Sequence, residues 1–256
     1  MIKNFLLLII PCLVWSQELS FIEKTPLNAD IFLGLDTFNN TYYIRNQVLY
    51  KKSESNLFNF NEFQLGKINS VDIINPLNVV VFYADFNTVI FLDNNLNEIE
   101  RIYFNRLSEF KNISTATLAG NNNLWVFNIN TQQLELFNYR SLRESVVSQP
   151  FPGKLLSQSS NFNYCFVLTE NKLRSFNIYG SLIFEKDSNG FEKIVQQNEN
   201  IIAIKENELF FISENSINPK KIPLPEINIK DLQLTQDFLY IYDGNYIHTF
   251  NLTKPN

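Results

Sequence analysis

The sequence predicts an all-β protein, a β-propeller of six four-stranded blades that an N-terminal strand closes. Three observations favour this fold class. Short runs of Val, Ile, Leu, Phe and Tyr alternate with polar clusters rich in Asn, and no long stretch of helical periodicity follows the first segment. A pair of strands with the same kind of turn recurs about every 40 residues, which is a repeat length typical of propeller blades.

Residues 1–16 have the order of a secretory signal peptide. Lys3 precedes an apolar run that ends at Val14, and the small Ser16 follows it. The run is too short to span a bilayer. A lipoprotein anchor would acylate Cys12, but Pro11 stands where a small residue is expected. We therefore expect cleavage without an anchor, and a mature chain of residues 17–256 that forms a single propeller domain with no transmembrane segment.

Composition and charge exclude some classes of function. The chain has 45% hydrophobic and 14% aromatic residues, enough for a sizeable core. Its 21 Lys and Arg are outnumbered by 26 Asp and Glu, which argues against a nucleic-acid partner because phosphate binding needs clustered basic residues. Cys165 is the only cysteine of the predicted mature chain. We expect it to be a small buried hydrophobic residue, and no internal disulfide can form.

The two middle strands of each unit carry the repeat most clearly. Successive first members begin 37 to 45 residues apart and successive second members 36 to 45 residues apart. The mature length of 240 residues, 256 minus 16, gives 40 residues for each of six units. The first members begin at Tyr42, Val79, Leu124, Tyr164, Ile201 and Phe238, and the second members begin at Val48, Thr88, Gln133, Lys172, Glu208 and Tyr246.

Asn-rich turns separate these strands, and flanking strands complete each unit. Asn tolerates left-handed backbone angles and takes that role in a chain with only 7 Gly. A sandwich or barrel is the rival fold, but it does not require the same turn at every fourth strand. We expect inner strands at 31–35, 71–74, 113–118, 155–158, 193–196 and 229–234, and outer strands at 60–65, 98–103, 143–147, 181–184 and 221–224.

The sixth unit has no outer strand of its own, because only 251–256 follow its third strand. The run 19–22 precedes the first unit and is not assigned to it. We predict that this run pairs with 246–250 and closes the ring, which leaves no long sheet edge exposed.

No catalytic, cofactor-binding or metal-binding constellation stands out, and we predict no cofactor. His248 is the only histidine, so we expect a structural or solvated role. The carboxylates Asp36, Asp85, Asp93 and Asp243 lie at strand ends, where we expect them to form turns. A carboxylate pair across the central channel could still perform glycosidase chemistry.

Two long connectors carry apolar side chains and supply the candidate partner-binding residues. Phe104, Leu107 and Phe110 lie between units two and three, and Phe151 lies between units three and four. Such side chains either tuck under a sheet or anchor a partner protein.

The units lack the Trp-Asp pair of WD40 repeats and the Gly-Gly of kelch repeats. Their polar turns, such as Leu92-Asp93-Asn94-Asn95, resemble those of degenerate propellers in bacterial envelope proteins. With the signal end Val14-Trp15-Ser16-Gln17 and an Asn-, Ile-, Lys- and Phe-rich composition, the chain is similar to exported proteins of the Bacteroidota.

That resemblance implies a non-catalytic periplasmic propeller that docks on an outer-membrane protein complex. In the same group, a small periplasmic subunit plugs the type IX secretion translocon, so an outer-membrane protein or a translocon subunit is the expected partner. Two alternatives remain open, a ligand- or glycan-binding propeller and a carboxylate-based carbohydrate-active enzyme.

Overall fold

The structure is a computed structural model that describes residues 19–214 and 218–252. The predicted signal peptide and Cys12 lie outside the described residues. Within these two ranges, no helix has the length and apolar character needed to cross a membrane.

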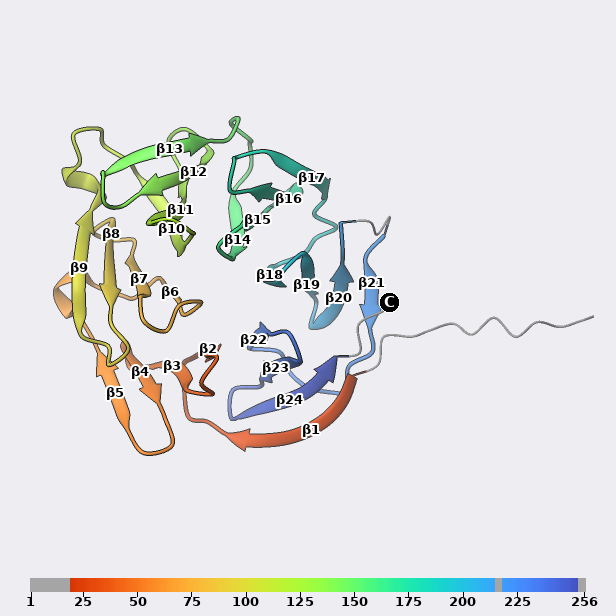
Figure 1. Ribbon diagram of the computed structural model, residues 1–256. Coiled ribbons are helices and arrows are strands. Elements are labelled where there is room, and N and C mark those ends of the chain that lie inside the picture. The colour runs from red at the N-terminus through yellow and green to blue at the C-terminus, as the bar shows by residue number, and fades with distance from the viewer. Residues whose placement is uncertain (1–18, 215–217, 253–256) are drawn as a thin grey trace, which may run out of the picture.

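Six four-stranded antiparallel sheets surround a central channel (Figure 1). The first three blades follow the chain from their inner to their outer strand, so the predicted fold class is confirmed. Blade one contains β2 (Ile31–Leu35), β3 (Thr41–Arg45), β4 (Val48–Lys52) and β5 (Leu57–Phe60); blade two contains β6 (Ser70–Asp72), β7 (Val79–Tyr83), β8 (Thr88–Leu92) and β9 (Glu98–Tyr103); blade three contains β10 (Ile113–Leu118), β11 (Asn123–Asn128), β12 (Gln133–Asn138) and β13 (Arg143–Val147).

Blades four and five repeat this order, whereas the last blade takes its outer strand from the N-terminus. Blade four contains β14 (Leu155–Ser160), β15 (Tyr164–Thr169), β16 (Lys172–Asn177) and β17 (Leu182–Asp187); blade five contains β18 (Lys193–Gln197), β19 (Asn200–Lys205), β20 (Glu208–Ile212) and β21 (Lys220–Ile222); blade six contains β22 (Asp231–Leu234), β23 (Phe238–Tyr242), β24 (Tyr246–Leu252) and β1 (Leu19–Pro26).

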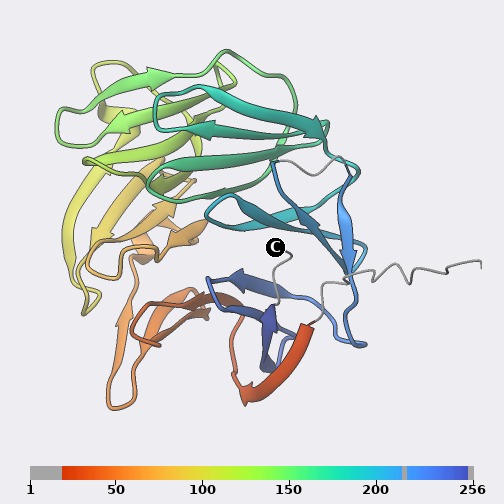
Figure 2. The same ribbon diagram turned by 45° about the vertical axis from the view of Figure 1, so that its right-hand side comes forward.

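The ring is closed as predicted. β1 runs antiparallel to β24 on the outside of blade six, with Leu19 opposite Leu252 and Pro26 opposite Tyr246 (Figure 2). The strand has eight residues, twice the length of the predicted run 19–22. The hydroxyl of Tyr242 lies 2.9 Å from the carbonyl oxygen of Ala29, so blade six also holds the connector that enters blade one.

Six hydrophobic clusters form the core, one at each interface between neighbouring blades. β7 shows why the second strands are continuously apolar. Its Val80 and Phe82 pack toward blade three, whereas Val79, Val81 and Tyr83 pack toward blade one. Each middle strand is therefore buried on both faces, and side-chain alternation serves two interfaces at once.

Asn provides much of the turn geometry, as expected from the scarcity of Gly. Thirteen non-Gly residues of the described chain have positive φ, and eight of them are Asn. Asn46 (φ 52°) and Asn207 (φ 63°) turn two of the hairpins between middle strands. Asn adopts this left-handed conformation at a lower cost than most other non-Gly residues.

Several predicted strand boundaries are wrong, among them those of β17 (Leu182–Asp187, not 181–184) and β21 (Lys220–Ile222, not 221–224). The outer strand of blade one is β5, not 60–65, because a tight turn in which Ser53 bonds Asn56 starts the strand earlier; Phe63–Leu65 instead forms a 3-10 turn, η1. β6 ends at Asp72 rather than 74, because the carboxylate accepts the backbone N–H of Ile74. β22 starts at Asp231 rather than 229.

Candidate functional site

The central channel contains a cavity of about 570 Å³. Inner strands of five blades line it, and it reaches the loops that join inner to second strands. We call that end of the ring the mouth face, and the opposite end, which carries the long connectors, the connector face. The apolar and aromatic wall residues are Leu33, Leu35, Val71, Ile73, Ile74, Val195, Leu232, Leu234, Phe238 and Tyr240, and polar residues near the mouth include Thr37, Asn39, Gln197, Gln236 and Asp237.

Asp72 is the acidic group of the inner wall. One carboxylate oxygen accepts the backbone N–H of Ile74 at 3.0 Å, and the other accepts that of Leu118, on β10 of blade three, at 2.6 Å. Burial outweighs these two bonds and raises the pKa of Asp72 to about 6. The side chain thus joins two blades and also places an acid in the cavity wall.

Hydrogen bonds from side chains join most neighbouring inner strands. Gln233 of β22 receives the N–H of Leu35 at 2.7 Å and donates to the carbonyl oxygen of Leu35 at 2.8 Å. The approach is close enough that a Cβ at Gly34 would lie 2.5 Å from the Gln233 side chain, and Gly34 has φ 138°. β2 and β6 are the exception among the described inner strands, because no hydrogen bond joins them directly.

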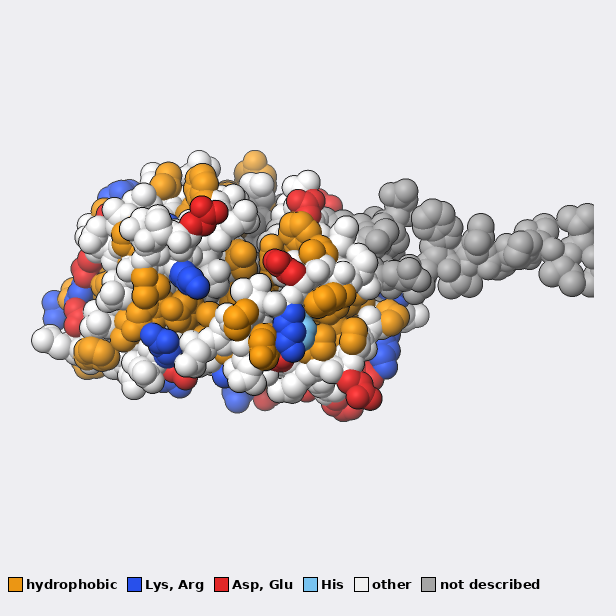
Figure 3. All heavy atoms as spheres, turned by 90° about the horizontal axis from the view of Figure 1, so that it is seen from below, with side chains coloured by type: hydrophobic (Ala, Val, Ile, Leu, Met, Phe, Trp, Pro, Cys, Tyr) orange, Lys and Arg blue, Asp and Glu red, His pale blue; other side chains and the backbone are white. Residues whose placement is uncertain are grey.

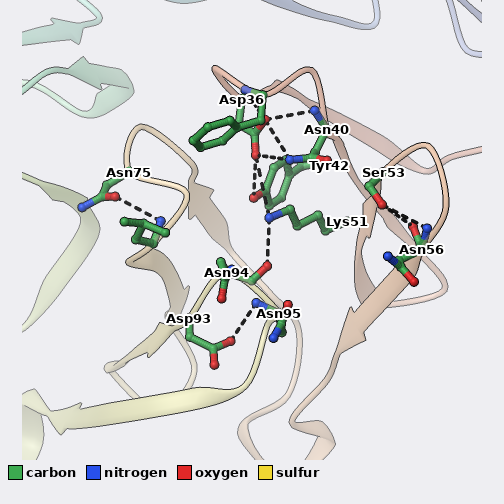
Figure 4. Close-up of polar contacts among 12 residues, drawn as sticks. Asp36, Asn40, Tyr42, Lys51, Ser53, Asn56, Asn75, Asp93, Asn94 and Asn95 are labelled. Atoms are coloured by element: carbon green, nitrogen blue, oxygen red, sulfur yellow. Dashed lines mark hydrogen bonds and ion pairs between the residues drawn. The ribbon is translucent and has the colours of Figure 1, made fainter.

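A buried polar network joins blades one and two instead. The amine of Lys51 donates to the carbonyl oxygen of Asn94 at 2.8 Å and lies 3.9 Å from the carboxylate of Asp36 (Figure 4). Asp36 also receives hydrogen bonds from Asn40 and the hydroxyl of Tyr42. Burial and this carboxylate raise the pKa of Tyr42 above its usual range. Both oxygens of Asp36 are engaged, so the residue forms a turn and a blade contact.

Three apolar side chains project from the mouth loops. Phe38 is 70% exposed, Leu77 is 63% exposed and Phe162 is 40% exposed. We call these three residues the mouth crown. They come from blades one, two and four, and Thr37 and Asn39 on either side of Phe38 line the cavity. The mouth therefore combines apolar side chains with polar cavity walls.

The structure separates the four predicted partner-binding residues into two groups. Phe104 and Phe151 are buried, so they are removed from the partner-contact candidates. The Phe104 ring lies 4.9 Å from that of Phe137, and the Phe151 ring lies 5.6 Å from that of Phe176. Connectors return beneath the junction of two blades, and these rings fill it. Leu107 is half-buried against the same core, whereas Phe110 is 57% exposed.

Phe110 belongs to a row of exposed apolar residues on the connector face. Phe63, Phe86 and Ile129 are 63%, 48% and 45% exposed. With Phe110, we call them the connector-face belt. Contacts between successive loops bring them together. Gly66 lies next to the Asp85 side chain, the Asn87 side-chain amide donates to the carbonyl oxygen of Lys111, and the Ile129 N–H donates to that of Asn112 at 2.8 Å.

Buried charge anchors this row. The amine of Lys111, next to Phe110, lies 2.9 Å from Glu135 and 3.1 Å from Glu144. Burial opposes ionisation, but the two carboxylates still hold the pKa of Lys111 above its usual value. The connector is thus held in place while the Phe110 side chain remains exposed.

His248 lies at the closing seam. Its Nε2 is 2.7 Å from the Asp243 carboxylate, which also accepts two backbone N–H groups of its own turn. Despite partial burial, these bonds hold the pKa of Asp243 below its usual value. Lys24 lies 3.9 Å from the centre of the Tyr246 ring. Figure 3 looks onto this edge of the ring, where hydrophobic side chains surround basic residues and the pale-blue histidine.

The remaining candidates for chemistry have structural roles. Cys165 is buried between blades three and four, and burial raises its pKa well above the usual value. Asp93, like Asp36 and Asp243, accepts backbone N–H groups in a turn, as predicted. No cluster of three His, Cys, Asp or Glu able to hold a metal ion is found among the described residues.

Sequence reasoning missed Asp72 and the mouth crown. A local signal for the crown exists. Asp36, Asn75 and Asn161 each accept a backbone N–H two residues further on. Phe38 and Leu77 lie at that position, and Phe162 lies one residue earlier, so an Asx turn displays each side chain. Nothing local distinguishes Asp72, because its contact with Leu118 joins residues of different blades.

No protein family and no curated protein matches the sequence. Solved structures are similar in fold: the WD40 domain of Pan2 from Neurospora crassa (TM-score 0.60, 8% identity, 89% of this chain and 76% of that one) and a streptogramin B lyase (0.59, 11%, 90% and 98%). A chain of a mitotic checkpoint complex is also similar (TM-score 0.61, 10% identity, 92% and 94%). At these identities the likeness shows the propeller fold alone.

Proposed function

We propose that this chain is an exported, non-catalytic propeller that docks on a protein complex of the outer membrane from its periplasmic side. The connector-face belt is the observation that carries the proposal. It places three exposed Phe and one Ile on neighbouring loops of three blades. Exposed aromatic clusters of this kind are typical of protein interfaces.

The belt also has the rigidity that a docking surface needs. Asn87 and Lys111 hold the loops on both sides of Phe86 and Phe110, through the Lys111 carbonyl oxygen and the two ion pairs of its amine. A surface that is ordered before binding loses less conformational entropy on association. Export supports a periplasmic location, and it rests on the order of residues 1–16.

The finer part of the proposal concerns the partner. The resemblance to exported Bacteroidota propellers favours a subunit of the type IX protein-secretion translocon as the partner. The ring would then plug or gate the periplasmic mouth of that translocon. Plugging would use the whole ring as the obstructing body.

Co-purification from gently solubilised envelope membranes tests the proposal. A C-terminally tagged wild-type chain is expected to retain an outer-membrane protein, and the variant F63S/F86S/F110S is expected to lose it. L57S/I99S/L182S is the matched control, since it removes three exposed apolar side chains from the outer strands β5, β9 and β17, away from both faces. Circular dichroism establishes that both variants are folded.

Three results would count against the proposal. A wild-type chain that elutes alone contradicts docking, and so does a folded belt variant that retains the partner as well as the wild type. A partner outside the type IX translocon contradicts the finer part and leaves docking intact.

A further inference from the structure

The mouth loops differ from blade to blade. In blades one, two and four they display the mouth crown, Phe38, Leu77 and Phe162. The corresponding loops of blades three, five and six are polar, with Asn121 and Asn122, Asn198 and Glu199, and Gln236 and Asp237. Apolar side chains therefore project from three of the six mouth loops, and the polar loop of blade three lies between those of blades two and four.

The crown side chains stand on anchored turns. The carboxylate of Asp36 accepts the N–H of Phe38 at 2.9 Å, and the amide oxygen of Asn75 accepts that of Leu77 at 3.0 Å. The loop of Phe162 is held by its neighbour, because Trp125 donates to the carbonyl oxygen of Asn161 at 3.1 Å. These loops present apolar groups to solvent with little freedom to withdraw them.

The cavity below the crown is acidic. Its charged lining residues are Asp36, Asp72 and Asp237, and no Lys, Arg or His lines it among the described residues. Lys51 lies close enough to Asp36 to balance its charge. Asp237 is exposed at the rim, and no ion pair to it is present in the described part of the chain. Asp72 and Asp237 thus give the cavity an uncompensated negative charge.

The wall of this cavity combines polar side chains, such as Ser160 and Gln196, with apolar ones. Leu33, Val71 and Ile73 line it, and the volume of about 570 Å³ lies within the usual range for sites that enclose a small ligand. A Lys or Arg side chain matches this arrangement because its stem is apolar and its head carries the complementary charge. Crown residues on three separate blades would contact groups on either side of that head.

We propose that the mouth binds a polypeptide segment of a partner protein, with a Lys or Arg side chain inserted into the cavity and flanking apolar residues packed on Phe38, Leu77 and Phe162. The site lies on the opposite face from the connector-face belt and does not depend on it. Charge complementarity identifies the inserted residue, and the spacing of the crown over three blades favours an extended segment over a single small molecule. Asp237 receives the cationic head, and the negative charge of Asp72 in the wall adds to the attraction.

Selection from phage carrying random heptapeptides tests this site on the full mature chain. Enriched peptides are expected to carry a Lys or Arg beside aromatic or aliphatic residues. Fluorescence polarisation of one enriched peptide then gives its affinity, which is expected to fall as salt rises. A variant of this peptide in which Glu or Met replaces the Lys or Arg should bind at least about tenfold more weakly.

Variants of the protein assign the site. D237K and F38S/L77S change exposed residues, so both variants should fold like the wild type. Each is expected to lower the affinity for the peptide by about tenfold. F63S/F86S/F110S is the control and should bind as the wild type does. The proposal is overturned if no peptide is enriched, if enriched peptides lack a basic residue, or if folded D237K and F38S/L77S bind with unchanged affinity.

Discussion

The two faces of the ring use aromatic residues in opposite ways. On the connector face, Phe104 and Phe151 are buried between blades, although both belong to loops. On the mouth face, Phe38 and Phe162 project into solvent from turns of only a few residues. A connector must pass from an outer strand to the next inner strand and crosses the blade junction on the way. A mouth loop joins adjacent strands of one blade and has no junction to fill.

The difference shows that the path of a loop decides whether an apolar residue in it is buried or exposed. It also explains why the connector face shows both behaviours. Phe110 lies in the same connector as Phe104, yet it is exposed because Lys111 and Asn87 hold that end of the connector against the loops.

Both faces belong to one closed ring, and deletion of β1 would open it. Removing residues 19–26 from the mature chain exposes the edge of β24 and the ring of Phe250, which now packs 5.8 Å from Phe21. We expect loss of cooperative unfolding, or a Tm lower by about 10 °C or more. Differential scanning calorimetry measures this, and an unchanged transition would refute closure by β1.

The two Phe residues of one connector sharpen the comparison. Phe104→Ala removes a fully buried ring and should lower the free energy of unfolding by about 3 to 5 kcal/mol. Phe110→Ala, in the same connector, should change it by no more than about 0.5 kcal/mol. Urea unfolding of both variants gives the two values. Equal effects would show that burial does not separate these residues.

Adjacent lysines provide a similar pair near the mouth. Lys51→Met leaves Asp36 buried without a cation and the Asn94 carbonyl oxygen without its donor, so we expect a loss of about 3 kcal/mol. Lys52→Met changes an exposed neighbour and should cost about 0.5 kcal/mol or less. Chemical denaturation measures both free energies of unfolding. A Lys51→Met variant as stable as the wild type would show that the network does not stabilise the interface between blades one and two.

The cavity wall predicts a pH dependence. The pKa of Asp72 is about 6 in the folded chain and 3.8 in its reference state, so the folded state binds more protons between these values. The contribution of Asp72 to the free energy of unfolding is therefore fully present below pH 3.8 and is lost as the pH rises through about 6. Wild-type stability minus that of Asp72→Asn should therefore fall by about 2 kcal/mol between pH 4 and pH 7. A flat difference would contradict the burial of this carboxylate.

Much of the fold follows from local patterns. The middle strands of each blade and the closing strand were predictable because doubly buried strands leave apolar runs, and because turns that need left-handed residues recur with Asn. The predicted strand 60–65 is wrong, because Phe63 and Leu65 are apolar for reasons outside their own segment. Leu65 packs into the interface of blades one and two, while Phe63 lies in the connector-face belt.

The candidate sites were less predictable. Phe110 could be singled out as an apolar residue in a long connector, but the partners that separate it from Phe104 lie in other loops. Asp72 acquires its environment from Leu118, 46 residues away. The crown has a local signal in its Asx turns, although a turn shows that a side chain is displayed and not which cavity it adjoins.

Site-specific photo-crosslinking in intact cells tests the central claim, that the connector face carries the docking surface. A photoreactive phenylalanine analogue replaces Phe110 in one chain and the buried Phe104 in another, with folding checked by protease resistance. The account predicts an adduct with an outer-membrane protein from position 110 and none from position 104. Absence of any adduct at 110, or the same adduct from both positions, would contradict it.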